Sequence, residues 1–295
     1  MQEKLTIVLP CYNEAENIPD FFPGLLSFAE QKKFKVIAVN DGSVDKSPEL
    51  LQGFAEKYPF FTVLSHKRNR GYGGALKTGL NAVDTEFAIT IDADGQHRLE
   101  DVEKCLACIQ ETGADLVVGA RQNNSSGTYR TIGKYLIRLF ASSLLELPIK
   151  DLNSGMKCYR MCETKWYLEL CPDTMAFSDV ILLLMVNDRK LVVETPIEIV
   201  PRTAGESTIG TKTALDTIAE ILHLSILLRP MTTFSRLGIM FLLLGTAWSI
   251  FTYLNSKTLS SAAVMLIIFA FFCFVLGLLG EQLAQIRRHL ARRGE

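Results

Sequence analysis

Residues 87–97 read Phe-Ala-Ile-Thr-Ile-Asp-Ala-Asp-Gly-Gln-His, an apolar run that ends in a polar cluster. Short apolar runs bounded by polar or glycine-containing turns are typical of strands buried on both faces. The other such runs are Leu5–Leu9, Phe34–Val39, Phe61–Leu64 and Leu116–Val118, and helix-like stretches between them are Ala15–Glu30, Asp45–Tyr58, Gly74–Ala82 and Leu99–Glu111. This order predicts an α/β fold with a Rossmann-like, mostly parallel sheet that binds ligands at the carboxyl ends of its strands.

The polar cluster after the Phe87–Ile91 run predicts a metal site. In extended backbone, residues two apart face the same side, so we expect Asp92, Asp94 and Gln96 to converge. Oxygen donors of this kind suit Mg²⁺ or Mn²⁺. The alternative is a solvated turn, but two close carboxylates without a cation repel each other. We therefore favour the metal.

A second polar cluster follows the first predicted strand, from Pro10 to Asn17. An aromatic residue beside carboxylates, here Tyr12 and Glu14, can hold a base and a ribose at this position. The alternative is an ordinary helix start, in which Asn13 caps the helix and Glu14 interacts with the helix dipole.

The second predicted strand ends in Asn40-Asp41-Gly42. Asp41 can accept a hydrogen bond from the imino N–H of a nucleotide base, and Gly42 permits a tight turn. The alternative is an Asp-Gly turn followed by a helix-capping Asp45.

Glycines also open the helix-like stretch at Asn69–Ala75, where backbone N–H groups could face a phosphate. The segment is not a dinucleotide-binding fingerprint. It is not a P-loop either, because Leu76 and not glycine precedes Lys77. The sequence therefore argues against a nicotinamide enzyme and against an NTPase.

The composition excludes further classes. Lys and Arg number 31 against 32 Asp and Glu, so the net charge of −1 gives no basic field for nucleic acid. Seven cysteines form an odd set without disulfide-rich spacing, which suits reduced thiols. Cys105 and Cys108 form a C-x-x-C pair with no second pair, and helix packing is favoured over a zinc or redox role.

Two long apolar segments lie near the C-terminus. Leu237–Leu254 has 18 residues without a charge and Thr258–Gly280 has 23, whereas a helix crosses a bilayer with roughly 20. Arg229 and Arg236 precede the first segment and an arginine cluster follows the second. The positive-inside bias therefore predicts two spans with both termini and the catalytic domain in the cytoplasm. The alternative is a pair of buried core helices.

Two amphipathic stretches accompany these segments, Thr131–Leu147 and Thr213–Leu228. Either would serve as an ordinary core-facing helix. Because the second adjoins the apolar segments, we expect it to lie in the headgroup plane of a membrane.

The order of the motifs resembles the family 2 inverting glycosyltransferases of the GT-A fold. It is most similar to the polyprenyl-phosphate branch, which contains dolichyl-phosphate mannose synthases and bacterial glucosyltransferases. The matching motifs are Leu9-Pro10, Asn13–Asn17, Asn40–Ser43, Asn69–Gly71, Asp92–Asp94, Gly119–Arg121, Asp151–Gly155 and Arg202–Ser207. Asn40, Lys134 and Thr208 depart from the family pattern.

The resemblance implies metal-dependent, inverting transfer of a sugar from a UDP- or GDP-sugar to a polyprenyl phosphate, for cell-envelope glycan or glycosylation pathways. It implies site residues in three groups. The donor site would contain Pro10, Tyr12, Glu14, Asp41, Ala93, Ser154 and Arg202; Mg²⁺ or Mn²⁺ would bind Asp92, Asp94 and Gln96; and Arg121, Arg130 and Asp151 would serve the acceptor phosphate and the reacting centre.

A lipid phosphate is largely dianionic at neutral pH, because its second pKa is about 6. A strong general base is therefore not needed, and we expect Asp151 to orient groups or to assist only weakly. The expected parts are a GT-A domain over 1–210, an interfacial helix and linker over 211–233, a transmembrane hairpin over 234–283 and a basic tail over 284–295.

Two rival functions remain open. A processive polysaccharide synthase usually carries a Gln-x-x-Arg-Trp segment, and neither Trp166 nor Trp248 follows an arginine. A non-catalytic membrane scaffold would have lost its acidic metal ligands, which this chain retains. The sugar, the base, the prenyl length and the oligomeric state stay open, and a homo-oligomer is compatible with the sequence.

Overall fold

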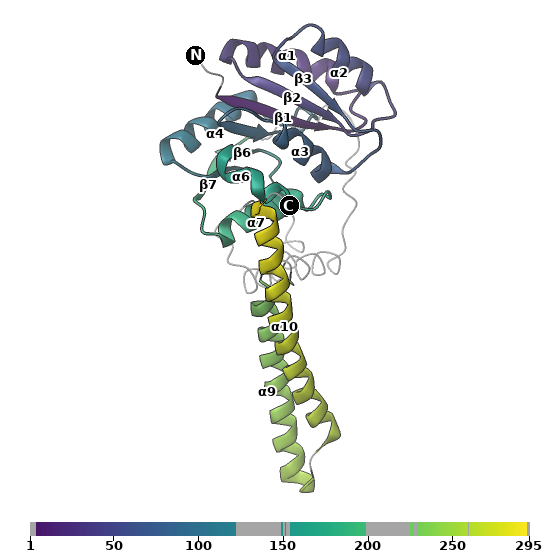
Figure 1. Ribbon diagram of the computed structural model, residues 1–295, viewed down its shortest axis with the longest axis vertical. Coiled ribbons are helices and arrows are strands. Elements are labelled where there is room, and N and C mark those ends of the chain that lie inside the picture. Colours follow the sequence, from purple (N-terminus) through teal and green to yellow (C-terminus); the bar gives the residue numbers. More distant parts are fainter. Residues whose placement is uncertain are drawn as a thin grey trace. The chain divides into compact units, whose positions relative to one another are not determined.

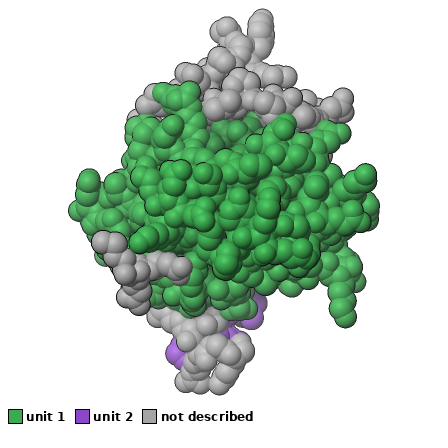
Figure 2. Space-filling model, turned by 90° about the horizontal axis from the view of Figure 1, so that it is seen from above, with its two compact units in different colours: residues 1–125, 148–208 green, residues 126–147, 209–295 purple. Residues whose placement is uncertain are grey.

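The computed structural model describes residues 4–121, 149, 151, 154–198, 225–226, 229–258 and 260–293. These residues form two compact units, coloured separately in Figure 2. The first unit contains the described residues within 1–125 and 148–208, and the second contains those within 126–147 and 209–295.

The described part of the first unit is built on a seven-stranded sheet with the order β3-β2-β1-β4-β6-β5-β7 (Figure 1). Its strands are β1 (Leu5–Cys11), β2 (Lys35–Asn40), β3 (Phe61–Ser65), β4 (Phe87–Thr90), β5 (Leu116–Arg121), β6 (Lys157–Arg160) and β7 (Val192–Ile197). Only β6 runs antiparallel to its neighbours, β4 and β5. The other pairs are parallel, so the predicted α/β fold with a mostly parallel sheet is confirmed.

Helices cover both faces of this sheet, as Figure 1 shows. They are α1 (Ile18–Lys32), α2 (Ser47–Ala55), α3 (Tyr72–Asn81), α4 (Leu99–Thr112), α6 (Met161–Leu168) and α7 (Phe177–Asn187). Leu5, Ile7 and Leu9 of β1 share one apolar core with α1 and α4. Val8 points to the opposite face, against Gly79 of α3. Burial on both faces explains why β1 reads as an almost continuous apolar run.

Two strands, β6 and β7, are not predicted by the pattern of apolar runs. β6 has only four residues, Lys157-Cys158-Tyr159-Arg160, so it forms no apolar run. β7 lies at the edge of the sheet and contains Glu194 and Pro196. Proline is tolerated at an edge because one side of an edge strand needs no ladder hydrogen bonds.

The cysteines support the packing interpretation. All seven are free thiols, and Cys105 and Cys108 both lie on α4. Burial raises the pKa of Cys105 to about 12 and also raises the pKa of Cys108. Thiols that hold their protons this firmly are poor metal ligands and poor nucleophiles.

The loop at residues 172–174 lies directly on the start of α3. A methyl group at Gly73 would approach the backbone oxygens of Pro172 and Thr174 to 2.5 and 2.6 Å. We expect Gly73→Ala to destabilise the first unit by about 1–3 kcal/mol, because backbone atoms cannot move aside as a side chain can. The measurement is the thermal unfolding midpoint of the full chain in detergent.

Gly24→Ala is the matched control for this prediction. Gly24 also lies in a helix, α1, but a methyl group there meets nothing within 4 Å. Alanine should be neutral or stabilising by up to about 1 kcal/mol at that position. Equal midpoints for the two variants would contradict the close approach at Gly73.

The second unit contains two long helices, α9 (Pro230–Ser256) and α10 (Ser261–Arg293). The candidate spans, Pro230–Ser256 and Ser261–Arg287, have mean hydropathies of 1.8 and 3.0, and only 11% and 22% of their apolar windows are buried. This exposure argues against a pair of buried core helices. The two helices are long and apolar enough to cross a membrane, as predicted.

Small residues let the two helices approach each other. A methyl group at Gly238 would lie 3.0 Å from the oxygen of Ala270, and one at Gly245 would lie 3.2 Å from the oxygen of Ala263. Close backbone approach at glycines is typical of helix pairs in membranes. The Thr131–Leu147 stretch and most of the predicted interfacial helix lie outside the described residues, so those assignments and the domain boundaries stay predictions.

Candidate active site

The predicted site residues gather where the sequence places them, at the carboxyl ends of the strands. Tyr12 follows β1, Asp41 follows β2 and Asp92 lies two residues beyond β4. The parallel register aligns Cys11 with Asn40 and Val8 with Thr90, so these three strands end at the same edge of the sheet.

The loops after β1 and β2 bind each other. The side chain of Asn13 accepts a hydrogen bond from the Val44 N–H at 3.0 Å, and the N–H groups of Glu14 and Ala15 donate to Ser47 and Asp45 at 2.9 and 3.0 Å. Asn13 has a left-handed φ of 55°. It therefore joins two loops and does not cap α1, which begins at Ile18.

These contacts organise the predicted donor-binding residues at and after the end of β1. Tyr12 is 46% exposed, so its ring is available to a planar ligand. Glu14 accepts a hydrogen bond from the side chain of Asn17 at 2.6 Å, and Pro10 is half-buried within the strand. Asp45 accepts from the Ser47 N–H at 2.9 Å just before α2, whose N-cap residue is Lys46.

Asp41 is only 2% exposed and acts as an anchor for the next loop. Its carboxylate accepts hydrogen bonds from His66 Nδ1 at 2.6 Å and from the backbone N–H groups of Arg70 and Gly71 at 2.9 and 2.8 Å. Recognition of a base by Asp41 stays a prediction. The hydrogen bonds of the Asp41 carboxylate hold the backbone at Arg70 and Gly71, directly before α3.

For the glycine-rich start of α3, the prediction that backbone N–H groups face a phosphate is wrong at two positions. The N–H of Gly71 donates to Asp41, and the N–H of Gly74 donates to the backbone oxygen of Asp173 at 3.0 Å. These two groups therefore serve the protein and do not face a phosphate. Lys77 and Arg70 bind the side chain of Asp173 at 2.7 and 3.6 Å. The glycines make room for the loop that carries Asp173.

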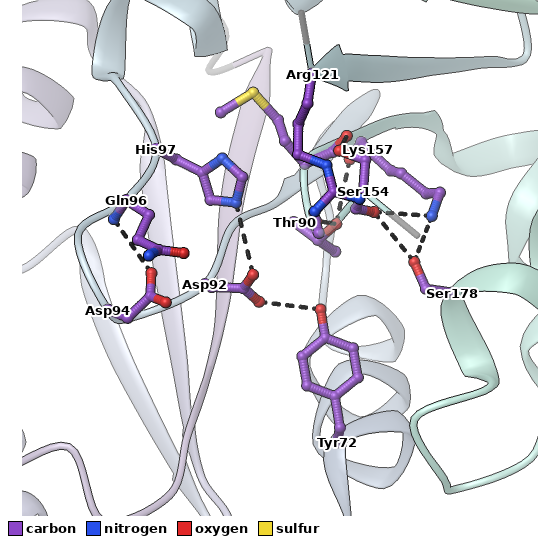
Figure 3. Close-up of polar contacts among 12 residues, drawn as sticks. Tyr72, Thr90, Asp92, Asp94, Gln96, His97, Arg121, Ser154, Lys157 and Ser178 are labelled. Atoms are coloured by element: carbon purple, nitrogen blue, oxygen red, sulfur yellow. Dashed lines mark hydrogen bonds and ion pairs between the residues drawn. The ribbon is translucent and has the colours of Figure 1, made fainter. Parts of the chain in front are cut away.

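The acidic loop after β4 carries Asp92, Asp94 and Gln96 (Figure 3). Asp92 accepts a hydrogen bond from the Tyr72 hydroxyl at 3.1 Å and lies 3.6 Å from His97 Nε2. Burial works to raise the pKa of Asp92, but the hydrogen bonds from His97 and Tyr72 and the charge of Lys157 bring that pKa below its usual value. Asp94 accepts from the Gln96 N–H at 3.1 Å.

The donor set of this loop fits a hard divalent cation. Two carboxylates and one amide oxygen are the ligand types that Mg²⁺ and Mn²⁺ prefer. Among the described residues, no group of three or more His, Cys, Asp or Glu side chains is arranged to hold a metal. Mg²⁺ commonly completes its coordination shell with water and substrate phosphate oxygens, so few protein ligands are needed. Ala93 belongs to the apolar core, so only its backbone is available to a ligand.

A turn at Ser154-Gly155 presses against Asp92. A methyl group at Gly155 would overlap Asp92 Oδ2 and lie 3.0 Å from Cγ. Thr90 fixes this turn from β4, because its hydroxyl donates to the Gly155 oxygen at 2.8 Å. The Ser154 side chain is buried and donates to the Met156 oxygen at 3.4 Å, so the predicted donor contact would use its backbone.

Arg121 ends β5 and forms a two-pronged ion pair with Asp151. Its Nε and Nη2 atoms each donate to the carboxylate at 2.7 Å, and its backbone N–H donates at 3.1 Å. Glu194 accepts from the Asp151 N–H at 3.0 Å. The pair uses two of the five guanidinium N–H groups, and the Arg121 side chain is 36% exposed. An anion can therefore still reach it.

The ion pair also defines the chemistry of Asp151. Burial favours a higher pKa for this carboxyl group, but the hydrogen bonds and charge of Arg121 lower the pKa below its ordinary value. A carboxylate that binds protons so weakly is a poor general base at neutral pH. Arg130 and Arg202 lie outside the described residues, so their roles stay predictions.

A mostly parallel sheet with one antiparallel strand between β4 and β5, and an Asp-Ala-Asp loop after β4, define a glycosyltransferase of the GT-A type. The chain matches the family model "Glycosyl transferase family 2" over residues 6–166 and the model "GtrB C-terminal hairpin" over residues 229–286. It belongs to glycosyl transferase family 2, and the predicted family is confirmed.

Curated relatives include an undecaprenyl-phosphate 4-deoxy-4-formamido-L-arabinose transferase of Edwardsiella ictaluri, 25% identical over 98% of this chain and 91% of that protein. A dolichol-phosphate mannosyltransferase of Pyrococcus furiosus is 27% identical over 75% of this chain and 63% of that protein. The match to a dolichyl-phosphate beta-glucosyltransferase of Dictyostelium discoideum spans only 53% of that protein. The resemblance to the polyprenyl-phosphate branch is thus confirmed.

Solved structures share the fold. Glucosyl-3-phosphoglycerate synthase from Mycobacterium tuberculosis, in complex with Mn²⁺, UDP and phosphoglyceric acid, aligns with a TM-score of 0.57 at 18% identity over 76% of this chain and 78% of that one. S. aureus TarS in complex with UDP-GlcNAc aligns with a TM-score of 0.52 at 16% identity over 98% of this chain and 87% of that one. At these identities the likeness concerns the fold alone.

Proposed function

We propose that this chain transfers a sugar from a UDP- or GDP-sugar to a polyprenyl phosphate, with Mg²⁺ or Mn²⁺ held at the Asp92–Gln96 loop. The observation that carries the proposal is the partly exposed guanidinium of Arg121, anchored by Asp151. An anchored, planar cation suits a phosphate monoester acceptor. The names of the polyprenyl-phosphate transferases among the relatives support the same acceptor class.

We assign a separate role in the proposed reaction to each group of site residues. Asp92, Asp94 and Gln96 would hold the divalent ion, which would supply charge neutralisation for the departing nucleoside diphosphate. Arg121 orients the acceptor phosphate, whose oxygen attacks the anomeric carbon on the face opposite to the leaving group. Asp151 holds Arg121 in place. Its lowered pKa is compatible with this role, because a dianionic phosphate needs no strong base.

The two apolar helices supply the membrane anchor in this proposal. A polyprenyl tail stays in the bilayer, so its transferase must work at the headgroup layer. Arginines lie near the outer ends of the two helices: Arg229 precedes α9, Arg236 lies near its start, and Arg287 and Arg288 lie towards the end of α10. By the positive-inside bias, the hairpin begins and ends in the cytoplasm, where the catalytic unit would also lie.

The test uses the full chain in detergent or nanodiscs with undecaprenyl phosphate and a panel of UDP- and GDP-sugars. We expect one donor to give a lipid product heavier by a single sugar, detected by mass spectrometry. Removal of divalent ions with a chelator should stop the reaction, and Mn²⁺ or Mg²⁺ should restore it. Products with a growing series of sugars would support a processive synthase instead. No turnover with any donor would favour the scaffold.

A further inference from the structure

Lys157 is a buried cation that the roles described above do not use. It is the first residue of β6, between Thr90 of β4 and Val118 of β5, and it is 0% exposed. Burial of an ammonium group costs several kcal/mol unless partners compensate for the lost water. A lysine in the middle of the sheet therefore needs compensating partners.

Two of those partners are polar groups of neighbouring segments. The Nζ atom of Lys157 donates to the Ser154 backbone oxygen at 2.9 Å and to the hydroxyl of Ser178 (Figure 3). Ser178 lies in the first turn of α7, and its hydroxyl also donates to the Ser154 oxygen at 3.3 Å. Lys157 thus connects α7 to the turn that presses against Asp92.

The other partners are charges from the surrounding elements. Asp179 of α7, Asp151 and Asp92 favour the protonated lysine, whereas Arg121 opposes it. Burial is the largest influence and lowers the pKa of Lys157 to about 8. The side chain is therefore mostly protonated at pH 7, and its charge lowers the pKa values of both Asp92 and Asp151.

This position matters because the proposed reaction gathers negative charge. Asp92, Asp94 and Asp151 would share the site with a diphosphate and a lipid phosphate. A fixed cation acts more strongly in a water-poor interior than at the surface, and it needs no rearrangement when substrates arrive. The Nζ atom is buried and hydrogen-bonded to Ser154 and Ser178, so it acts through other groups.

We propose that Lys157 is a positioning residue for the transfer reaction: its buried ammonium holds the Ser154-Gly155 turn against Asp92 and supplies a fixed positive charge behind Asp92 and Asp151. The inference rests on the proposed function, because it assigns Lys157 to the site of that reaction. It differs from a purely structural role in requiring the charge of Lys157, and not only its hydrogen bonds.

Lys157→Gln tests this requirement, because glutamine keeps a hydrogen-bond donor and loses the charge. We expect kcat to fall roughly 10²-fold, with the KM for the nucleotide-sugar changed less than about threefold. Ser178→Ala removes a hydrogen bond and keeps the charge, so kcat should fall less than about tenfold. Lys165→Gln, at an exposed position of α6, is the control and should match the wild type.

The pH–rate profile is an independent readout. Because the pKa of Lys157 in the free protein is about 8, the charge is lost as the pH rises through 8, and wild-type kcat/KM should fall there. Lys157→Arg keeps its charge above that pH, so the fall should move to higher pH. A wild-type kcat/KM that stays constant between about pH 7 and 9.5 would overturn the proposal even if the glutamine variant failed to fold, because kcat/KM reports groups of the free enzyme.

The outcomes separate the two proposals. An active wild type with an equally active Lys157→Gln overturns the role of Lys157 alone. A wild type that turns over no donor overturns the proposed function, and this inference with it. A glutamine variant with normal thermal stability, unchanged KM and greatly reduced kcat supports the positioning role.

Discussion

Asp94→Ala is expected to reduce kcat for sugar transfer by roughly 10³-fold or more while the protein still folds and enters the membrane. The removed carboxylate is only 7% exposed and lies on the loop after β4. Loss of a metal ligand removes several kcal/mol of charge stabilisation from the transition state, and about 4 kcal/mol corresponds to roughly 10³-fold in rate. The measurement is single-sugar transfer to undecaprenyl phosphate at saturating Mn²⁺.

A second measurement separates metal binding from chemistry. Titration of the apoprotein with Mn²⁺, followed by electron paramagnetic resonance in the presence of UDP, should show much weaker binding to Asp94→Ala than to the wild type. Asp84→Ala is the control, because Asp84 is exposed and bound to Lys35 at 2.8 Å, before β4. Near wild-type turnover by Asp94→Ala would remove Asp94 from the metal site.

The regular part of the fold follows from local pattern. β1 to β5 are short apolar runs, and each predicted run overlaps its strand. The apolar runs predict these strands because the strands are buried on both faces, so nearly every residue in them is apolar. β6 has no apolar run, since Lys157 and Arg160 occupy half of its four positions. Its place between β4 and β5 comes from pairing with residues about 40 and 70 positions away.

The site could be predicted from short spacing along the chain but not from contacts between distant segments. Alternate spacing places Asp92, Asp94 and Gln96 on one loop, and their convergence on a metal stays a prediction. The partners of Asp92 do not follow from that spacing, because Tyr72 precedes it by 20 residues. The contact of Asp173 with the start of α3 spans 96 residues to Lys77. The sequence alone allows the glycine N–H groups to face a phosphate, because local spacing does not reveal the contact with the loop at Asp173.

The sequence around Lys157 indicates a buried charge. Lys157 stands between Met156 and Cys158, and the structure buries both of them. Lysine is almost never fully buried unless paired, so its presence in such a segment indicates a compensated charge. The sequence does not identify Ser178 as its partner, because 21 residues and one helix separate the two.

Gly155→Ala is expected to lower kcat by roughly 10²-fold through displacement of Asp92. The added methyl group would overlap Asp92 Oδ2 and lie 3.0 Å from Cγ. Asp92 cannot simply turn away, because Tyr72 and His97 fix its other contacts at 3.1 and 3.6 Å. The Ser154-Gly155 turn cannot easily retreat either, since Thr90 donates to the Gly155 oxygen at 2.8 Å. The strain must therefore move a group that the reaction needs.

Gly53→Ala is the matched control for Gly155→Ala. Gly53 is exposed on α2 and a methyl group there meets nothing within 4 Å, so this variant should keep wild-type kcat and gain up to about 1 kcal/mol in stability. Kinetics and thermal unfolding are measured on both variants in detergent. Because the displacement concerns one carboxylate, Gly155→Ala should lose far more activity than stability. Wild-type kcat for Gly155→Ala would mean that the orientation of Asp92 does not limit transfer.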